Sequence, residues 1–398
     1  MKWCPMIINV KLDRATVPIE RQVFESLFEQ SVVCDRAPVH RALREGAMPY
    51  RTLVNLAREA EIPYPLFFAP TDVVEEQLRL KTEKLMVGFN KKIEFSMNSR
   101  NRIHLPQVEL IVKDLLRKQA YIKTDKSLPK NRIVNLIRKP GASVVEDAAK
   151  LMAALELGPN DMRGTRNKGA ALNLLVQKLE AQHVLVAQSA KSYMPQKMPK
   201  NAKFSGMTVK DSKVPYIFIA SGDEGEKMEP AGRRVFTLTL LTVLVARGTF
   251  ATVTYSGHTS DETASREYEL TAEILMPASD FRLSDLSTLD AVQDLAGVYK
   301  VTPSAVVMRG RRLGLLGPDD ADAYLSELQA AYENADDHPW NKMLAVNALK
   351  KYNGVECSRR MLAVLDAGGI SHGDFCRVMF SNTLRTKAQV NDFRAAIG

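Results

Sequence analysis

The sequence has little cysteine and no long apolar run. Its four cysteines are scattered and never form a C-x-x-C pair, so we expect neither a disulfide framework nor a cysteine zinc site. No stretch approaches the roughly 18 consecutive apolar residues of a transmembrane helix. The first residues lack the basic and apolar regions of a signal peptide, and internal repeats and low-complexity segments are also missing. These absences favour a cytoplasmic protein with no membrane association.

The remaining composition is that of a globular protein with one basic block. The chain has 398 residues, enough for two or three domains, with 45% hydrophobic and 25% charged residues. Residues 81–140 hold 15 Lys and Arg against 5 Asp and Glu, which accounts for the whole net charge of +9. Such a block attracts phosphate-bearing or acidic partners, although a solubilising helical face is the alternative. Its candidate contacts are Lys91, Lys92, Arg100 and Arg102.

Hydrophobic periodicity predicts an α+β protein. Apolar residues at helical spacing predict helices over 50–62, 73–95, 108–118, 143–157, 168–181, 265–275, 287–312 and 318–334, with short helices across 19–62. Strands are expected at 184–186, 214–220 and 249–256. Residues 235–246 are apolar almost all round, which is typical of a buried helix. The expected plan is helical at the N-terminus, α+β in the middle and helical in the C-terminal tail.

Four blocks in the central part of the chain carry a resemblance to a known family. In order they are Phe204–Met207, Val214–Ile219, Arg233–Leu238 and Ala272–Pro277. In the residues and the order of these four blocks, the chain resembles the ImmA/IrrE family of zinc metallopeptidases. The resemblance implies a zincin-like domain, with a small sheet and a buried helix, over residues 141–334.

The residues at the expected metal site depart from that family. Its H-E-x-x-H motif places two zinc-binding histidines on one helix face and a glutamate between them as general base. Here the histidine positions hold Leu240 and Leu244, and the glutamate position holds Leu241. None of these can bind zinc or carry a proton, so we expect no metal, no cofactor and no catalytic residue. An acid within 261–269 is not assigned a role, and His258 is interpreted as a loop histidine.

The N-terminal segment carries a weaker resemblance. His40–Gly46, Met48–Leu53 and Leu66–Phe68 are similar to the end of an XRE-type helix-turn-helix. If that module binds DNA, basic residues would meet phosphates, and the candidates are Arg36, Arg41, Arg44 and Arg51. Pro38, however, falls where the recognition helix should run, and few side chains there can read bases. A structural or protein-binding remnant is therefore the alternative.

Together these features predict four segments and a regulatory function. The segments are a helix-turn-helix-like module (1–70), a basic helical connector (71–140), the peptidase-like domain (141–334) and a small helical domain (335–398). The leading hypothesis is a catalytically inactive ImmA/IrrE-like regulator that binds a protein encoded by a neighbouring gene, DNA, or both. Its setting would be prophage or mobile-element control, phage defence or a toxin–antitoxin pair. The alternatives are a sequence-specific DNA-binding repressor or antitoxin and a hydrolase with a non-standard site. Homo-oligomerisation is left open.

Overall fold

The structure is a computed structural model that describes residues 6–29, 31, 33–34, 36–85, 95–96, 108–196, 204–221, 229–254, 265–334 and 343–398. It confirms the mixed α+β class. Contacts divide the chain into two compact units, the first formed by Met1–Val87 with His104–Asp114 and the second by Gly88–Ile103 with Leu115–Gly398. The finer division into four segments stays a prediction.

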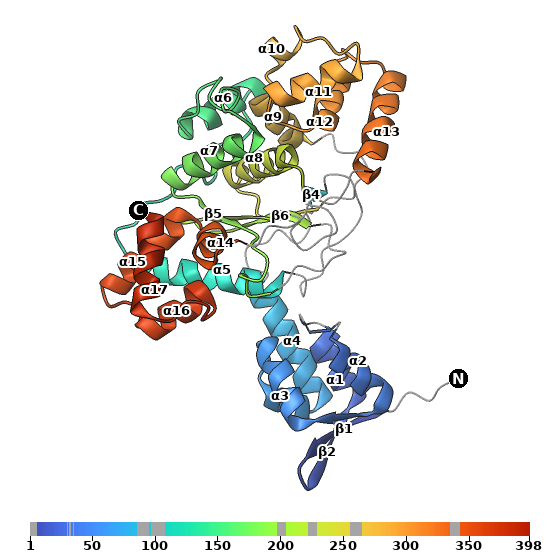
Figure 1. Cartoon of the computed structure of the whole chain (residues 1–398), viewed down its shortest axis with the longest axis vertical. Coiled ribbons are helices and arrows are strands. Elements are labelled where there is room, and N and C mark those ends of the chain that lie inside the picture. Colours follow the sequence, from blue (N-terminus) through green and yellow to red (C-terminus); the bar gives the residue numbers. More distant parts are fainter. Residues whose placement is uncertain are drawn as a thin grey trace. The chain divides into compact units, whose positions relative to one another are not determined.

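The N-terminal unit combines helices with a small sheet (Figure 1). Its elements are β1 (Ile7–Leu12), β2 (Ala15–Glu20), α1 (Arg21–Glu29), α2 (Ala37–Glu45), β3 (Ala47–Pro49), α3 (Tyr50–Glu59), the 3-10 helix η1 (Tyr64–Phe68) and α4 (Thr71–Leu85). The sheet has the order β2-β1-β3, with β2 antiparallel and β3 parallel to β1. The expectation of a helical N-terminal region therefore needs correction.

Aromatic side chains hold the helices of this unit together. Phe28 of α1 lies 4.8 Å from Phe24 and 4.7 Å from Phe67, measured between ring centroids, and all three are buried. Such pairs add about 0.5–1.5 kcal/mol to the burial of the rings. Pro38 stands in the first turn of α2, where its fixed φ starts the helix instead of breaking it. The helix ends at Gly46, whose φ of 66° lies in the left-handed region that favours glycine.

The second unit contains the remaining elements. They are β4 (Phe95–Ser96), most of α5 (Glu109–Ile122), α6 (Val144–Ala154), α7 (Lys168–Ala181), β5 (Leu185–Gln188), β6 (Phe204–Val209), β7 (Tyr216–Ile219), α8 (Ala231–Arg247), β8 (Thr252–Thr254), α9 (Arg266–Leu275), α10 (Ala278–Phe281), α11 (Leu289–Val298), α12 (Pro303–Arg312), α13 (Pro318–Asn334), α14 (Ala345–Asn353), α15 (Val355–Asp366), α16 (His372–Phe380) and α17 (Lys387–Ile397). The predicted bounds of 168–181 for α7 are confirmed.

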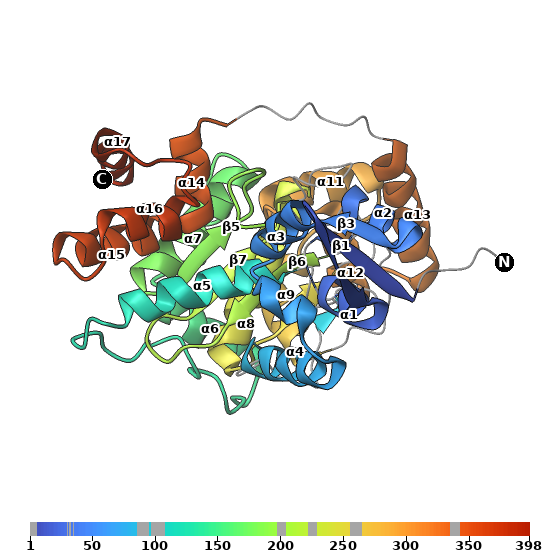
Figure 2. The same cartoon turned by 90° about the horizontal axis from the view of Figure 1, so that it is seen from below.

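Helices cover both faces of a five-stranded sheet in this unit. The strand order is β4-β8-β6-β7-β5, with β6 antiparallel to both of its neighbours and β5 parallel to β7. Helices α7 and α8 lie on one face and α5 crosses the other (Figures 1 and 2). From α5, the Gln119 amide donates to the carbonyl oxygen of Val214 at 2.9 Å, which fixes that helix to the start of β7.

Helix α8 is the centre of the largest hydrophobic core. Its residues from Thr237 to Ala246 are all buried, which confirms the predicted buried helix. The polar residues of this stretch include Thr239 and Thr242, whose hydroxyls donate to the carbonyl oxygens four residues earlier, of Val235 and Leu238, at 2.9 and 2.7 Å. These local bonds satisfy those two hydroxyls without any polar neighbour. Within the described ranges no helix is both long and apolar enough to cross a membrane.

Two of the C-terminal helices, α14 and α15, pack against the edge of the same sheet, and α16 and α17 pack against them. Helix α14 contacts β5, and α15 contacts both β5 and α7. The Tyr216 hydroxyl of β7 lies 2.7 Å from the Cys357 sulfur of α15. Gly354 joins α14 to α15 with a φ of 77°, and an added Cβ there would lie 2.4 Å from Glu180 Oε1 on α7. A glycine is therefore required at the point where these helices meet the core.

Candidate functional site

The three leucines at the two histidine positions and the glutamate position of the resemblance lie inside the core. Leu240, Leu241 and Leu244 each have 0% exposed surface. Gly206 of β6 makes room for this helix, since a Cβ at that glycine would lie 2.7 Å from Leu241 Cδ1 and 2.6 Å from the carbonyl oxygen of Phe218. The middle of α8 is thus packed directly onto the sheet.

Two acidic side chains of α9 near that helix, Glu267 and Glu273, form ion pairs. Glu267 pairs with Arg247 at 3.2 Å. Glu273 is buried and forms an ion pair with Arg309 of α12. His258 and residues 261–264 lie outside the described ranges. Among the residues that are described, no three His, Cys, Asp or Glu side chains gather closely enough to hold a metal ion.

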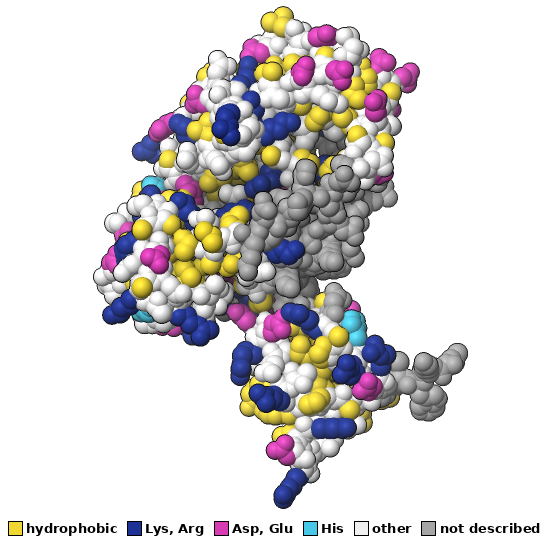
Figure 3. Space-filling model, in the orientation of Figure 1, with side chains coloured by type: hydrophobic (Ala, Val, Ile, Leu, Met, Phe, Trp, Pro, Cys, Tyr) yellow, Lys and Arg dark blue, Asp and Glu magenta, His cyan; other side chains and the backbone are white. Residues whose placement is uncertain are grey.

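The predicted basic contacts of the N-terminal unit lie on two helices. They differ in whether an acidic side chain pairs with them. Arg36, at the start of α2, forms an ion pair with Glu59 of α3. Arg41 and Arg44 of α2 and Arg51 of α3 are exposed, and no described residue supplies an acceptor for their guanidinium groups. Figure 3 shows Lys and Arg side chains spread over the visible face of this unit among apolar ones. Lys91, Lys92, Arg100 and Arg102 lie outside the described residues.

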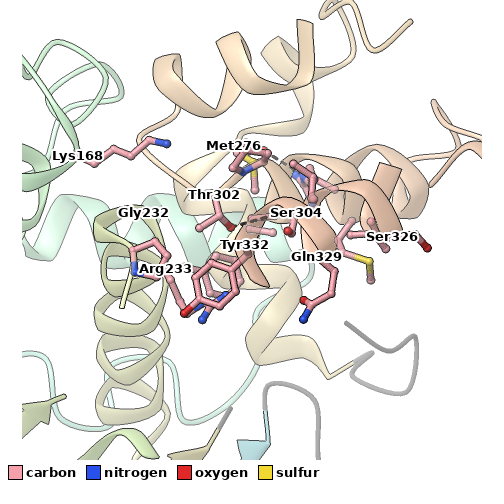
Figure 4. Close-up of a pocket in the computed structure, with 18 of the residues that line it drawn as sticks. Lys168, Gly232, Arg233, Met276, Thr302, Ser304, Ser326, Gln329 and Tyr332 are labelled. Carbon is pink, nitrogen blue, oxygen red and sulfur yellow. Dashed lines mark hydrogen bonds between the residues drawn. The ribbon is translucent and has the colours of Figure 1, made fainter. Parts of the chain in front are cut away.

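A pocket of about 760 Å³ opens at the first turn of α8 (Figure 4). Residues from α8, α9, α12 and α13 line it, together with Lys168 at the start of α7. This volume falls in the range of pockets that hold drug-sized ligands. We take this pocket as the candidate functional site.

Two helix N-termini meet at one wall of the pocket. A Cβ at Gly232 would lie 2.5 Å from the carbonyl carbon and oxygen of Val301, so only glycine lets α8 start this close to the start of α12. Thr302 caps α12 by accepting a hydrogen bond from the amide of Ala305, and Pro303 occupies the first turn. This is a standard way to begin a helix, and it directs the positive end of the α12 dipole to the pocket.

Four basic side chains, Lys168, Arg233, Arg309 and Arg312, line the pocket together with two acidic ones, Asp322 and Glu333, of which Asp322 pairs with Arg311. Lys168 reaches toward it from α7, and Arg233 lies over the ring of Tyr332, with the guanidinium carbon 5.5 Å from the ring centroid (Figure 4). Arg309 is held by Glu273 and by the carbonyl oxygen of Met276 at 3.1 Å. Burial, together with the charge of Lys300, lowers the pKa of Lys168. Both effects disfavour its ammonium form, so a negative neighbour would stabilise it.

An aromatic pair forms another part of the lining. Phe236 of α8 stacks against Tyr268 of α9 with ring centroids 6.4 Å apart and planes 24° from parallel. Tyr268 is 6% exposed, and among the described residues no group hydrogen-bonds its buried hydroxyl. Burial raises the pKa of this hydroxyl, so it stays protonated at neutral pH.

No motif in the sequence points to this pocket. Arg233 stands in one of the four family-like blocks, and Thr302-Pro303 carries a helix-start signal that says nothing about a cavity. Comparisons of the chain with family models, with curated proteins and with solved structures found no match.

Proposed function

We propose that this chain is a catalytically inactive regulator of the ImmA/IrrE type that acts by binding. The observation that carries the proposal is the packing of Leu240, Leu241 and Leu244 onto the sheet at Gly206. In a working enzyme of that type the same helix face would present two imidazoles and a carboxylate to a water-filled cleft. A fully buried apolar face stabilises the domain, at roughly 1.5–3 kcal/mol per side chain, but offers no site for hydrolysis.

The partner in this proposal is a protein encoded by a neighbouring gene, and the setting is the cytoplasm of a cell that carries a prophage, another mobile element or a toxin–antitoxin pair. A domain that has lost its cleavage centre can still hold such a partner through its surface. The test mixes the full chain with the product of the adjacent gene. We expect a stable complex in size-exclusion chromatography and no shortening of the partner on gels after prolonged incubation.

Cleavage of the partner would reject the inactive assignment, and two separate elution peaks would reject the binding role. A partner cut only by the wild-type chain, and not by a preparation inhibited with a chelator, would point to a metal-dependent hydrolase. The inactive assignment and the binding role are therefore tested by different results.

A second candidate function is DNA binding by the N-terminal unit. It is favoured by the exposed Arg41, Arg44 and Arg51, for which the described residues supply no acidic partner. Gel-shift titrations with the DNA upstream of the gene, at several salt concentrations, test it. Removing one phosphate-binding side chain should lower the slope of log affinity against log salt by about 1.

A double variant with a matched control makes the DNA test specific. We expect R41Q/R44Q, both on α2, to weaken binding and to reduce the salt slope. The control R282Q/R385Q removes the same charge from two exposed arginines of the second unit that make no ion pair among the described residues. If both double variants weakened DNA binding equally, the loss would come from net charge alone. DNA binding retained by R41Q/R44Q would reject this candidate function.

A further inference from the structure

The amides at the junction of α8 and α12 are available to a ligand. Ala231 and Gly232 of α8 and Ser304 of α12 line the pocket and stand in the first turn of their helices. First-turn amides have no acceptor within their own helix, and the described residues supply none for these three. Two helix dipoles add their positive ends at the same place. This arrangement is the one that proteins use to bind phosphate groups.

The unpaired Lys168 in the lining of the same pocket is a second and independent indication of a negative ligand. Lys168 is half-buried, lines the pocket and has no hydrogen-bond or ion-pair partner among the described residues. Besides burial, the charge of Lys300, which is also positive, lowers the pKa of Lys168. A half-buried cation next to another cation is unfavourable unless an anion accompanies it. Lys168 extends toward the centre of the site from the side of α7 (Figure 4).

The rest of the lining suits a flat ring more than a simple ion. The ring of Tyr332, which lies against Arg233, is one aromatic part of the lining. Phe236 and Tyr268 form a stacked pair that also lines the pocket. Tyr268 lines the site, and its buried hydroxyl has no partner within the described residues. Buried hydroxyl groups usually have one, so a polar group of a ligand is a suitable candidate. Ser326 and Gln329 of α13 add polar groups to the lining, and the Gln329 amide nitrogen donates to Glu333 at 2.6 Å (Figure 4).

From these features we propose that the pocket binds a small phosphate-bearing molecule with a flat ring, of the class and size of a mononucleotide. The phosphate contacts Lys168 and the amides at the junction of α8 and α12. The ring lies against the aromatic side chains, within reach of Ser326 and Gln329. This inference does not depend on the proposed regulatory function, because the pocket lies at the first turn of α8 and not at its buried leucines.

Isothermal titration of the full chain with four probes tests the proposal. The probes are inorganic phosphate, adenosine, AMP and a short single-stranded DNA. We expect AMP to bind, adenosine to bind at least about tenfold more weakly, and inorganic phosphate to compete with AMP at higher concentration. The expected ratio reflects the loss of charge-assisted hydrogen bonds to the phosphate.

Point variants locate the ligand in the pocket. K168Q should weaken AMP binding about tenfold, since it removes one charge-assisted bond to the phosphate, and should leave the melting temperature close to that of the wild type. K150Q, an exposed lysine on α6 of the same unit, is the matched control and should bind as the wild type. Y332A should weaken AMP but not inorganic phosphate, since only AMP uses the ring. An unchanged circular dichroism spectrum shows that each variant is folded.

Four results would overturn the proposal. They are no heat with any probe at millimolar concentration, equal affinity for adenosine and AMP, equal binding by K168Q and K150Q, and tighter binding of the single-stranded DNA than of AMP. The last result would identify a nucleic-acid site in place of a small-molecule site.

Discussion

Glu180 couples the stability of the second unit to pH. It lies on α7, is 7% exposed, and faces the start of α15 at Gly354. Burial raises the pKa of its carboxyl to about 7, and the nearby carboxylate of Glu356 acts in the same direction. The amides of Glu356 and Val355 and the charge of Arg359 act in the opposite direction but do not outweigh burial. The folded protein therefore binds this proton more tightly than the unfolded chain does.

The sign of the pH dependence follows from this difference. The ordinary pKa of a glutamate is 4.5 and the folded value is about 7, so between these limits the folded state holds more protons. Stability should then fall as pH rises from about 4.5 to about 7, and the contribution should be constant outside that window. One pKa unit corresponds to about 1.36 kcal/mol, so the free energy of unfolding should decrease by at most about 3 kcal/mol.

Urea unfolding followed by circular dichroism between pH 4.5 and 8 measures this effect. We expect Glu180→Gln to match the wild type near pH 4.5 and to be more stable by up to about 3 kcal/mol at pH 8. Glu269→Gln, an exposed residue on α9, is the control and should follow the wild-type curve. His183, Glu356 and Arg360 adjoin this region, but they are present in all three proteins and cancel in the comparison. Parallel curves for wild type and Glu180→Gln would refute the reasoning.

Three further predictions concern packing, a buried ion pair and a helix cap. Gly206→Ala should lower the free energy of unfolding by about 1–3 kcal/mol, because the added Cβ meets Leu241 and the carbonyl oxygen of Phe218; an unchanged urea midpoint would contradict the close packing of α8 on β6. Arg309→Leu should cost about 3–5 kcal/mol by leaving Glu273 charged and buried, and the double variant Glu273→Leu/Arg309→Leu should recover most of that stability in the same urea assay. Thr386→Ala removes one side of the capping box of α17 and should cost about 1 kcal/mol, measured by thermal unfolding against the exposed Thr383→Ala.

Long periodic segments of the fold could be predicted from the sequence, while strands interrupted by glycine or proline could not. The apolar surface of α8 and the spacing of α7 each point to one structure. The strand β2 contains Pro18, which argues against a strand in general but is tolerated here because β2 lies at the edge of its sheet. The strand β6 has Gly206 in its interior and a register shift beside it, so its pattern is not regular.

The candidate pocket could not be predicted, for a different reason. Its lining comes from α7, α8, α9, α12 and α13, which are spread over residues 168–334, and no single segment carries a motif. Lys168 and Tyr268 point to a ligand only because they are half-buried or buried without a hydrogen-bond partner among the described residues. Burial removes the hydrogen bonds that water would otherwise provide, and it cannot be read from these two residues in the sequence. By contrast, the expectation that Leu240 and Leu244 cannot bind zinc can be drawn from the sequence, because it depends on residue type alone.

The zinc content of the purified full chain tests the central claim most directly. The chain is incubated with zinc, dialysed against zinc-free buffer and measured by elemental analysis. Because positions 240, 241 and 244 hold buried leucines, we expect far less than one zinc per chain. One tightly held zinc per chain, released together with loss of a peptidase activity on chelation, would contradict it.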